Sequence, residues 1–343
     1  RQIAFTNRLF DFDKILFVKR HDALGVFHMC DQYYGCNAVP GGGLFVLHDP
    51  FGKSPRVANL LADSVVEKGR LAGMKLENGS FLSPELSFNG EEILFAFSEA
   101  KAWAKYQGKE AYEWGPEISY HLFKCNVDGT GLTQLTDGPY DDFDPIYLPD
   151  EEHIAFSTTR GHTYVRCMPP TSAFVLARAN RDGSDIYLIS RNNEPDYLPS
   201  VMDDGRIIYT RWEYTDKPLW RAQGLWTVNP DGTGVATFWG NQSVWPDLLK
   251  DARNIPGSRR VMFTGSAHHN WFAGSVGIID PDGGYNFPHG LTKVTADVIW
   301  PESGNGPVDP VESPRYQASG EYAGYYSPYP LSRHDFLVSA ERA

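Results

Sequence analysis

The chain repeats one pattern of turns and short strands about every fifty residues, and this repeat constrains its fold more than any other feature. Each copy contains an Asp-Gly turn, a strand marked by a proline, a second turn and an apolar strand. The clearest Asp-Gly turns begin at Asp128, Asp182 and Asp231. Glycine adopts positive φ angles without a steric cost, so each Asp-Gly pair predicts a tight turn between strands. An interval of this length suits a unit of four short strands.

The apolar strand can be counted along the chain. Its six copies are KILFV (Lys14–Val18), EILFAF (Glu92–Phe97), HIAFS (His153–Ser157), RIIYT (Arg206–Thr210), RRVMFT (Arg259–Thr264) and DFLVS (Asp335–Ser339). A four-stranded blade cannot bury both of its faces alone, whereas a closed ring of blades can. We therefore predict an all-β, six-bladed β-propeller that forms a single domain over residues 1–343.

The sixth predicted blade is incomplete. The sequence stops after DFLVSAERA, before the two outer strands of that blade, and its first residue is not Met. We therefore expect the chain to be part of a longer, multidomain protein.

Composition and charge narrow the class of protein. Aromatic residues make up 14% of the chain, which also holds 33 glycines and 24 prolines, and this favours many strands separated by turns over helices. No apolar run is long enough for a transmembrane helix, so we predict no membrane span. The formal net charge of −12, without a cluster of Lys and Arg, argues against a nucleic-acid partner.

The four cysteines have no CxxC spacing, so they predict neither a zinc knuckle nor a haem attachment site. They are Cys30, Cys36, Cys125 and Cys167. A local disulfide between Cys30 and Cys36 in an oxidising compartment and free, buried thiols are both compatible with the sequence.

The unit that reads LTDGPYDDFDP, followed by LPD and IAFSTTR, resembles the repeats of TolB-type propellers. A wider resemblance, over most of the chain, is to the propeller (middle) domain of the hydrazine synthase alpha subunit and its relatives. It is carried by ILFVKR with the loop that ends in GGGLFVL, DGTGLTQLTDG with FDP, PDGTG with IPGSRRVMF, and YYSPYPL with FLVSA. The resemblance implies a TolB-like propeller in a periplasmic or secreted protein, with other domains or subunits of the same complex as partners.

One departure from that family limits what the resemblance implies. Hydrazine synthase alpha subunits carry a further domain with CxxCH haem attachment sites, and this chain contains no CxxCH. We expect haem only if a domain or partner outside this chain supplies it. A hydrazine-forming reaction is therefore not carried over.

Strand direction sorts the connections of the predicted propeller onto two faces. The four strands A to D of a blade alternate in direction, with the proline-marked strand as A and the apolar strand as B. The loops after B and D then open on one face, and the short A–B and C–D turns lie on the other. The long loops follow strand B, at Arg20–Gly43, Ser98–His121, Thr158–Pro170, Arg211–Gly224 and Ser266–Gly274. We place the candidate site on this loop-rich face, because rigid scaffolds carry function on such loops.

Five residues of these loops are candidate metal ligands. His268 and His269 follow strand B of the fifth blade, and imidazole is a common metal ligand near neutral pH. Cys167 and His162 share the loop of the third blade, where a thiolate beside cationic groups could bind a metal. His28 lies in the first long loop. A divalent metal, zinc or calcium, is the expected cofactor; structural histidines and a small buried cysteine are the alternatives.

The candidate ligand-binding residues are Arg160, Arg211, Trp212, Glu213, Asp144 and Tyr33. Arg211 offers a planar fork for carboxylates, and Trp212 offers a stacking face for a sugar or a cation. Alternatively, Arg211 and Glu213 form an ion pair that ties adjacent blades together, and Asp144 caps a turn.

Three functions are compatible with this face. The first is a propeller domain, like that of the hydrazine synthase alpha subunit, that holds a small ligand, a metal or a cofactor-bearing partner domain. The second is a metal-dependent polysaccharide lyase or hydrolase with its site at the channel mouth, where Arg211 would neutralise a uronate of the glycan. The third is a non-catalytic interaction scaffold. The sequence contains no Ser-His-Asp order, nucleophile elbow, P-loop or dinucleotide fingerprint.

Overall fold

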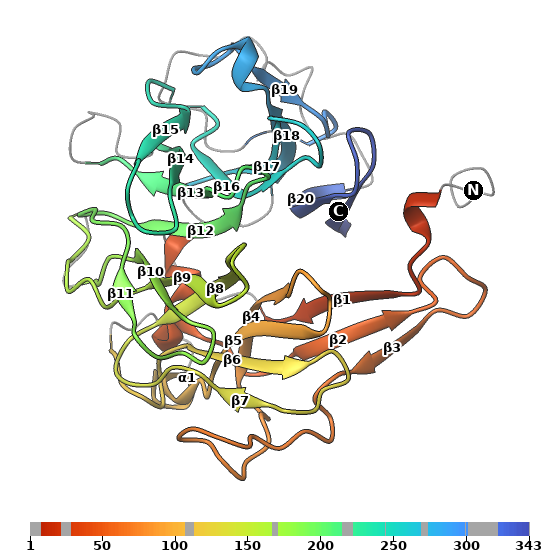
Figure 1. The fold of residues 1–343 in the computed structure, drawn as a ribbon, viewed down its shortest axis with the longest axis vertical. Helices are drawn as coiled ribbons and strands as arrows, with labels where there is room; N and C mark the ends of the chain where they lie inside the picture. The colour runs from red at the N-terminus through yellow and green to blue at the C-terminus, as the bar shows by residue number, and fades with distance from the viewer. Residues whose placement is uncertain are drawn as a thin grey trace. The chain divides into compact units, whose positions relative to one another are not determined.

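The computed structural model describes residues 8–21, 29–106, 113–166, 171–214, 222–243, 245–268, 274–298, 300 and 322–342. Within these residues the chain is almost entirely β-structure, and one short helix, α1 (Lys101–Tyr106), stands beside strands and 3₁₀ turns (Figure 1). The strands follow one another in groups that match the predicted repeat. We call each group a blade and number the blades 1 to 6 in chain order.

The first three blades are separate sheets with neighbouring strands in chain order. Blade 1 contains β1 (Lys14–Lys19), β2 (Gly43–His48) and β3 (Arg56–Asn59). Blade 2 contains β4 (Ser80–Leu86), β5 (Glu92–Ser98), β6 (His121–Asn126) and β7 (Thr133–Gln134). Blade 3 contains β8 (Asp142–Tyr147), β9 (His153–Thr158), β10 (Val175–Asn180) and β11 (Tyr187–Leu188).

The remaining blades are joined in one ten-stranded sheet. Blade 4 contains β12 (Asp196–Val201), β13 (Ile207–Trp212), β14 (Gln223–Val228) and β15 (Ala236–Trp239). Blade 5 contains β16 (Leu248–Asn254), β17 (Val261–Ser266), β18 (Gly274–Ile279) and β19 (Leu291–Lys293). Blade 6 contributes β20 (Tyr322–Pro330) and β21 (Phe336–Arg342). One β-sheet residue pair, Gln223 with Leu248, links blades 4 and 5, and another, Gly274 with Tyr325, links blades 5 and 6. The predicted fold class, an all-β propeller, is confirmed, and blade 6 contributes two strands within the described residues.

The chain divides into two compact units, each described by itself. Unit 1 comprises Arg1–Val26, Asp31–Ile154 and Ala179–Ile186, and unit 2 comprises Phe27–Cys30, Ala155–Arg178 and Tyr187–Ala343. The core of unit 1 contains a group of phenylalanines whose rings contact one another at centroid distances of 4.9 to 6.1 Å, Phe81, Phe95, Phe97 and Phe123. The core of unit 2 contains Trp239, Trp245, Phe263 and Trp300. Phe95 and Phe97 of β5 and Phe263 of β17 belong to the apolar strands that the repeat predicts, whereas Trp245 and Trp300 lie outside the strands.

A left-handed residue interrupts the first strand of blades 2 to 6. The residues are Ser83, Asp144, Leu198, Asp251 and Ser327, with φ between 49° and 56°. In β4, β12, β16 and β20 the register with the next strand shifts at this point, which is the mark of a β-bulge. Four of the five residues precede a proline, and a proline is tolerated there because the bulge does not need its missing N–H. The proline that marks strand A in the sequence therefore also marks a bulge.

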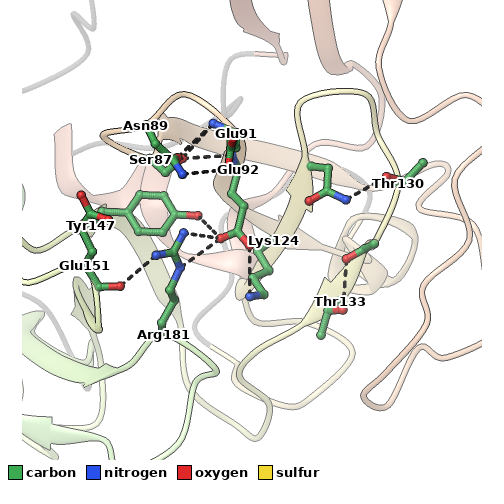
Figure 2. A network of polar contacts seen from close by, with 12 residues as sticks. Ser87, Asn89, Glu91, Glu92, Lys124, Thr130, Thr133, Tyr147, Glu151 and Arg181 are labelled. Atoms are coloured by element: carbon green, nitrogen blue, oxygen red, sulfur yellow. Dashed lines mark hydrogen bonds and ion pairs between the residues drawn. The ribbon is translucent and has the colours of Figure 1, made fainter.

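Glu92, the first residue of β5, joins blades 2 and 3 within unit 1 (Figure 2). Its Oε2 accepts hydrogen bonds from Arg181 Nε at 3.1 Å and Nη2 at 2.8 Å, and from the Tyr147 hydroxyl at 3.3 Å. Lys124 lies 3.6 Å from Glu92 Oε1, and Arg181 also donates to the Glu151 carbonyl. The Arg181 guanidinium lies 5.0 Å from the centre of the Tyr147 ring. We call these residues the Glu92 clamp.

Candidate functional site

The structure places the predicted site residues in both units. Unit 2 contains Arg160, His162, Arg211, Trp212, Glu213 and His268, and unit 1 contains Tyr33 and Asp144. Arg160 is half-buried, and His162 is exposed. Three of the predicted metal ligands, His28, Cys167 and His269, lie outside the described residues. Their roles stay predictions.

The side chains of His268 and Trp212 meet in unit 2. His268 comes just after β17 and Trp212 is the last residue of β13, and both are about 1% exposed. The two rings pack edge to face with their centroids 4.8 Å apart. We call this end of unit 2, where β13 and β17 finish, its loop end.

A chain of hydrogen bonds fixes the His268 ring. The Tyr197 hydroxyl donates to Gln223 Oε1 at 2.5 Å, and Gln223 Nε2 lies 2.8 Å from His268 Nδ1. The 2.5 Å distance lies at the short end of the range of O–H···O bonds and below that of N–H···O bonds, which orients the Gln223 amide with its NH₂ group toward His268. His268 Nδ1 is therefore the acceptor, and the proton of the neutral ring sits on Nε2. A metal at His268 Nε2 would require the Gln223 amide to turn round.

Arg211 is held in unit 2 by a two-pronged ion pair with Asp196. Its Nε and Nη2 donate to the two carboxylate oxygens of Asp196 at 2.8 Å each. The guanidinium also lies over the rings of Tyr209 and Trp226, at 5.5 and 4.8 Å from their centres. Burial lowers the pKa of Arg211, but the hydrogen bonds and the charge of Asp196 outweigh it and raise that pKa overall. The carboxylate-binding fork of Arg211 is thus occupied by a residue of its own blade.

Glu213 and Glu194 add two more acids to this end of unit 2. Glu213 accepts a bond from Trp226 Nε1 at 3.3 Å. Glu194, in the loop after β11, is 1% exposed, and its Oε1 accepts the backbone N–H of Arg166 at 3.3 Å. Burial raises the pKa of Glu194 to about 7, because this one bond and the charge of Arg166 compensate only in part. Nothing in the sequence around Glu194 distinguishes it from a solvated loop acid.

In unit 1, the second half of the first long loop is packed into the interior. Residues 31 to 39 are all buried and include two 3₁₀ turns, of which η4 spans Gly35–Asn37. The Tyr33 ring stacks on Phe143 with centroids 5.1 Å apart and planes 8° apart. A Cβ on Gly35 would lie 2.1 Å from the carbonyl oxygen of Ile118, so this close packing requires glycine.

Buried aspartates hold this segment of unit 1. Asp141 Oδ1 accepts the backbone N–H groups of Gly35 and Tyr120, each at 2.8 Å. Burial raises the pKa of Asp141 to about 7, although these two bonds oppose the shift. Asp144 Oδ1 accepts a bond from the Ser83 hydroxyl, and these two residues are the left-handed positions in the first strands of blades 3 and 2. Asp144 thus connects two first strands.

The described cysteines Cys30, Cys36 and Cys125 are buried thiols that form no disulfide. The disulfide that the sequence allowed between Cys30 and Cys36 is not formed. Burial raises the pKa of both Cys36 and Cys125, the latter to about 12, so these thiols stay protonated. In the part of the chain that the structure describes, no group of three or more His, Cys, Asp or Glu side chains is arranged to hold a metal. No helix in that part is long and apolar enough to cross a membrane.

Comparisons with known proteins support the fold. The chain is similar to Kuenenia stuttgartiensis hydrazine synthase, with a TM-score of 0.63 and 17% identity over 96% of this chain and 42% of that one. It is also similar to a putative TolB from Agrobacterium tumefaciens (TM-score 0.47, 12% identity, 78% and 80% covered) and to puromycin hydrolase (0.49, 14%, 96% and 42%). No family model and no curated protein matches the sequence. The first similarity shows a shared propeller fold, and this chain spans less than half of that hydrazine synthase chain.

Proposed function

We propose that this chain is the propeller domain of a longer protein in the periplasm or outside the cell. In this proposal the loop end of unit 2 docks a second domain or subunit of the same complex, which carries any cofactor. The similarity to hydrazine synthase supports a place in a longer chain, because 96% of this chain matches 42% of that one.

The observation that carries the proposal is that the reactive groups at the loop end are held by internal partners. His268 is bonded to Gln223, Arg211 is paired with Asp196, and Trp212 is buried against His268. A catalytic site needs reactive groups within reach of a substrate. A docking site instead needs strand ends and loops held in fixed positions, and these contacts do that.

Two other functions stay predictions: a small-ligand or glycan site, and a metal-dependent lyase or hydrolase. The metal-dependent function depends in part on His28, Cys167 and His269, which lie outside the described residues. The small-ligand or glycan site depends on residues such as Arg211 and Trp212, which have internal partners. A zinc or calcium ion at His268 would need the Nε2–H tautomer to change. Stoichiometric metal in the purified protein that is lost in His268→Ala would favour the metal site over docking.

Site-specific photo-crosslinking tests the docking proposal. Tyr214 lies at the loop end, with its ring 5.7 Å from that of Trp212, and would be replaced by p-benzoylphenylalanine in the full-length protein. The control position is Val235, 43% exposed in the turn between β14 and β15 at the opposite end of the strands. We expect a discrete cross-link from position 214 to a peptide of another domain or subunit, and none from position 235. A cross-link from position 235 alone would overturn the proposal.

A further inference from the structure

A cavity of about 520 Å³ lies in unit 2 at the opposite end of its strands from the loop end. We call this the turn end, because short turns of blades 5 and 6 meet there. The lining residues are Gly257, Ser258, Arg259, Arg260, Asp280, Asp282 and Arg333. The first four lie in the turn between β16 and β17, the aspartates follow β18, and Arg333 lies between β20 and β21. A volume of this size suits a small ligand.

The lining of the turn-end cavity has an excess of hydrogen-bond donors. Each guanidinium carries five N–H donors and no acceptor. Within the described residues, Arg259 uses Nη1 on Asp282 at 2.6 Å, Arg260 uses Nε on Asp280 at 2.8 Å, and Arg333 uses Nη2 on a backbone carbonyl at 2.5 Å. Most donors of the three guanidinium groups therefore face solvent or the cavity.

Charge favours an anion in the same place. The lining holds three arginines and two aspartates in a chain whose formal net charge is −12, so this local excess of cations is not the background of the surface. The Arg259–Asp282 pair is exposed on both sides, at 73% and 64%. Such a pair is weak in water and yields to a ligand that offers more oxygen atoms.

The repeat shows what this position accepts elsewhere. Arg260, directly before the apolar strand β17, occupies the same position of the repeat as Glu92, the first residue of β5. In unit 1 the Glu92 carboxylate accepts the donors of Arg181 from a neighbouring turn. In unit 2 the same position supplies a guanidinium, and Arg333 comes from a neighbouring turn as well. The carboxylates of the cavity, Asp280 and Asp282, accept bonds from Arg260 and Arg259, whereas Arg333 donates to a backbone carbonyl.

We propose that the turn-end cavity binds a small, multiply charged oxyanion, a carboxylate or a phosphate. The guanidinium groups of Arg259, Arg260 and Arg333 bind its oxygens, by the two-pronged geometry that arginine forms with such groups. The site lies on the other side of unit 2 from the docking surface and does not depend on it.

Calorimetric titration of the protein at low salt tests the proposal, with citrate and pyrophosphate as separate probes. Arg260→Gln and Arg333→Gln each remove a charge from the cavity, and Arg191→Gln removes one from an exposed position of unit 2 that does not line it. We expect at least one probe to bind, with about tenfold weaker binding in each cavity variant and unchanged binding in Arg191→Gln. The tighter probe identifies the ligand as a carboxylate or a phosphate. Absence of binding by both probes, or an equal loss in Arg191→Gln, would overturn the proposal.

A gain-of-affinity variant guards against a folding artefact. Asp282→Asn keeps the backbone N–H that donates to Asp280 but removes the carboxylate that competes for Arg259. We expect it to bind the preferred probe several-fold more tightly than the wild-type protein. An affinity equal to or below that of the wild type would contradict the assignment.

Discussion

Two junctions between neighbouring blades, one in each unit, use the same positions of the repeat, but one junction is closed by bonds and the other is open. Between blades 2 and 3 the positions hold Glu92, Tyr147 and Arg181, which bond to one another (Figure 2). Between blades 4 and 5 the equivalent positions hold Arg206, Asn254 and Pro281, which line a cavity of about 270 Å³. The backbone of the repeat is shared, and the side chains decide whether the junction is closed or open.

The reason lies in the pairing of charges. Glu92 gains a partner from the next blade because Arg181 precedes the Asp-Gly turn of blade 3. The equivalent residue of blade 5 is Pro281, which has no side-chain donor, and Arg206 turns back to Asp204 of its own turn at 2.7 Å. One junction thus binds its neighbour, and the other leaves room for a ligand or for water.

Moving the blade 4 residue into blade 2 should break the closed junction. Glu92→Arg places a cation beside Arg181 and Lys124 at a site where the Glu92 side chain is 23% exposed. We expect the free energy of unfolding to fall by about 2–3 kcal/mol, since solvent screens part of the penalty of a fully buried charge. Urea denaturation measures this. Glu77→Arg, a reversal at an exposed position, is the control and should change the midpoint little; an equal loss in both variants would contradict the clamp.

The fold was predictable where the local sequence determines it. Asp-Gly turns and period-2 apolar strands locate the blades, and the alternation of strand direction places Trp212 and His268 at the same end. The bulges were visible only as prolines, because the left-handed residue before each proline follows from pairing with the next strand. Asp251 shows this, since it adopts the same conformation before an alanine.

The candidate site was predictable only in part, because its partners are ordinary residues in sequence. Gln223 and Tyr197 fix the His268 tautomer, yet neither belongs to a motif. In the sequence, Glu92 resembles a solvated charge at the start of a strand. The fold brings it into contact with Arg181, which lies 89 positions further along the chain. Long-range pairs of this kind depend on the packing of blades, which no local pattern encodes.

The pH dependence of stability should separate the clamp from the rest of the fold. Burial raises the pKa of Glu92, but the bonds of Arg181 and the charge of Lys124 outweigh it and lower that pKa below its ordinary value of 4.5. A carboxyl with a lowered pKa stabilises the fold above the pKa of the unfolded chain and loses this contribution as pH falls through the folded pKa. We expect the free energy of unfolding of the wild-type protein to exceed that of Glu92→Gln by about 1 kcal/mol at pH 7. This difference should shrink steadily below pH 4.5. Urea titrations at a series of pH values test this; a difference independent of pH would assign the effect to packing.

Building the closed junction into unit 2 is the subtlest test. Arg206→Glu and Pro281→Arg together recreate the Glu92–Arg181 pair at the positions that now line the open cavity. Each single change should be neutral or destabilising, because Arg206→Glu loses the bonds to Asp204 and Thr227 and Pro281→Arg leaves a cation near Arg259. The double-mutant cycle should still give a favourable coupling of about 0.5 kcal/mol, the size expected of a solvent-exposed pair. A coupling of zero would mean that the difference between the two junctions lies in their backbones rather than in their charges.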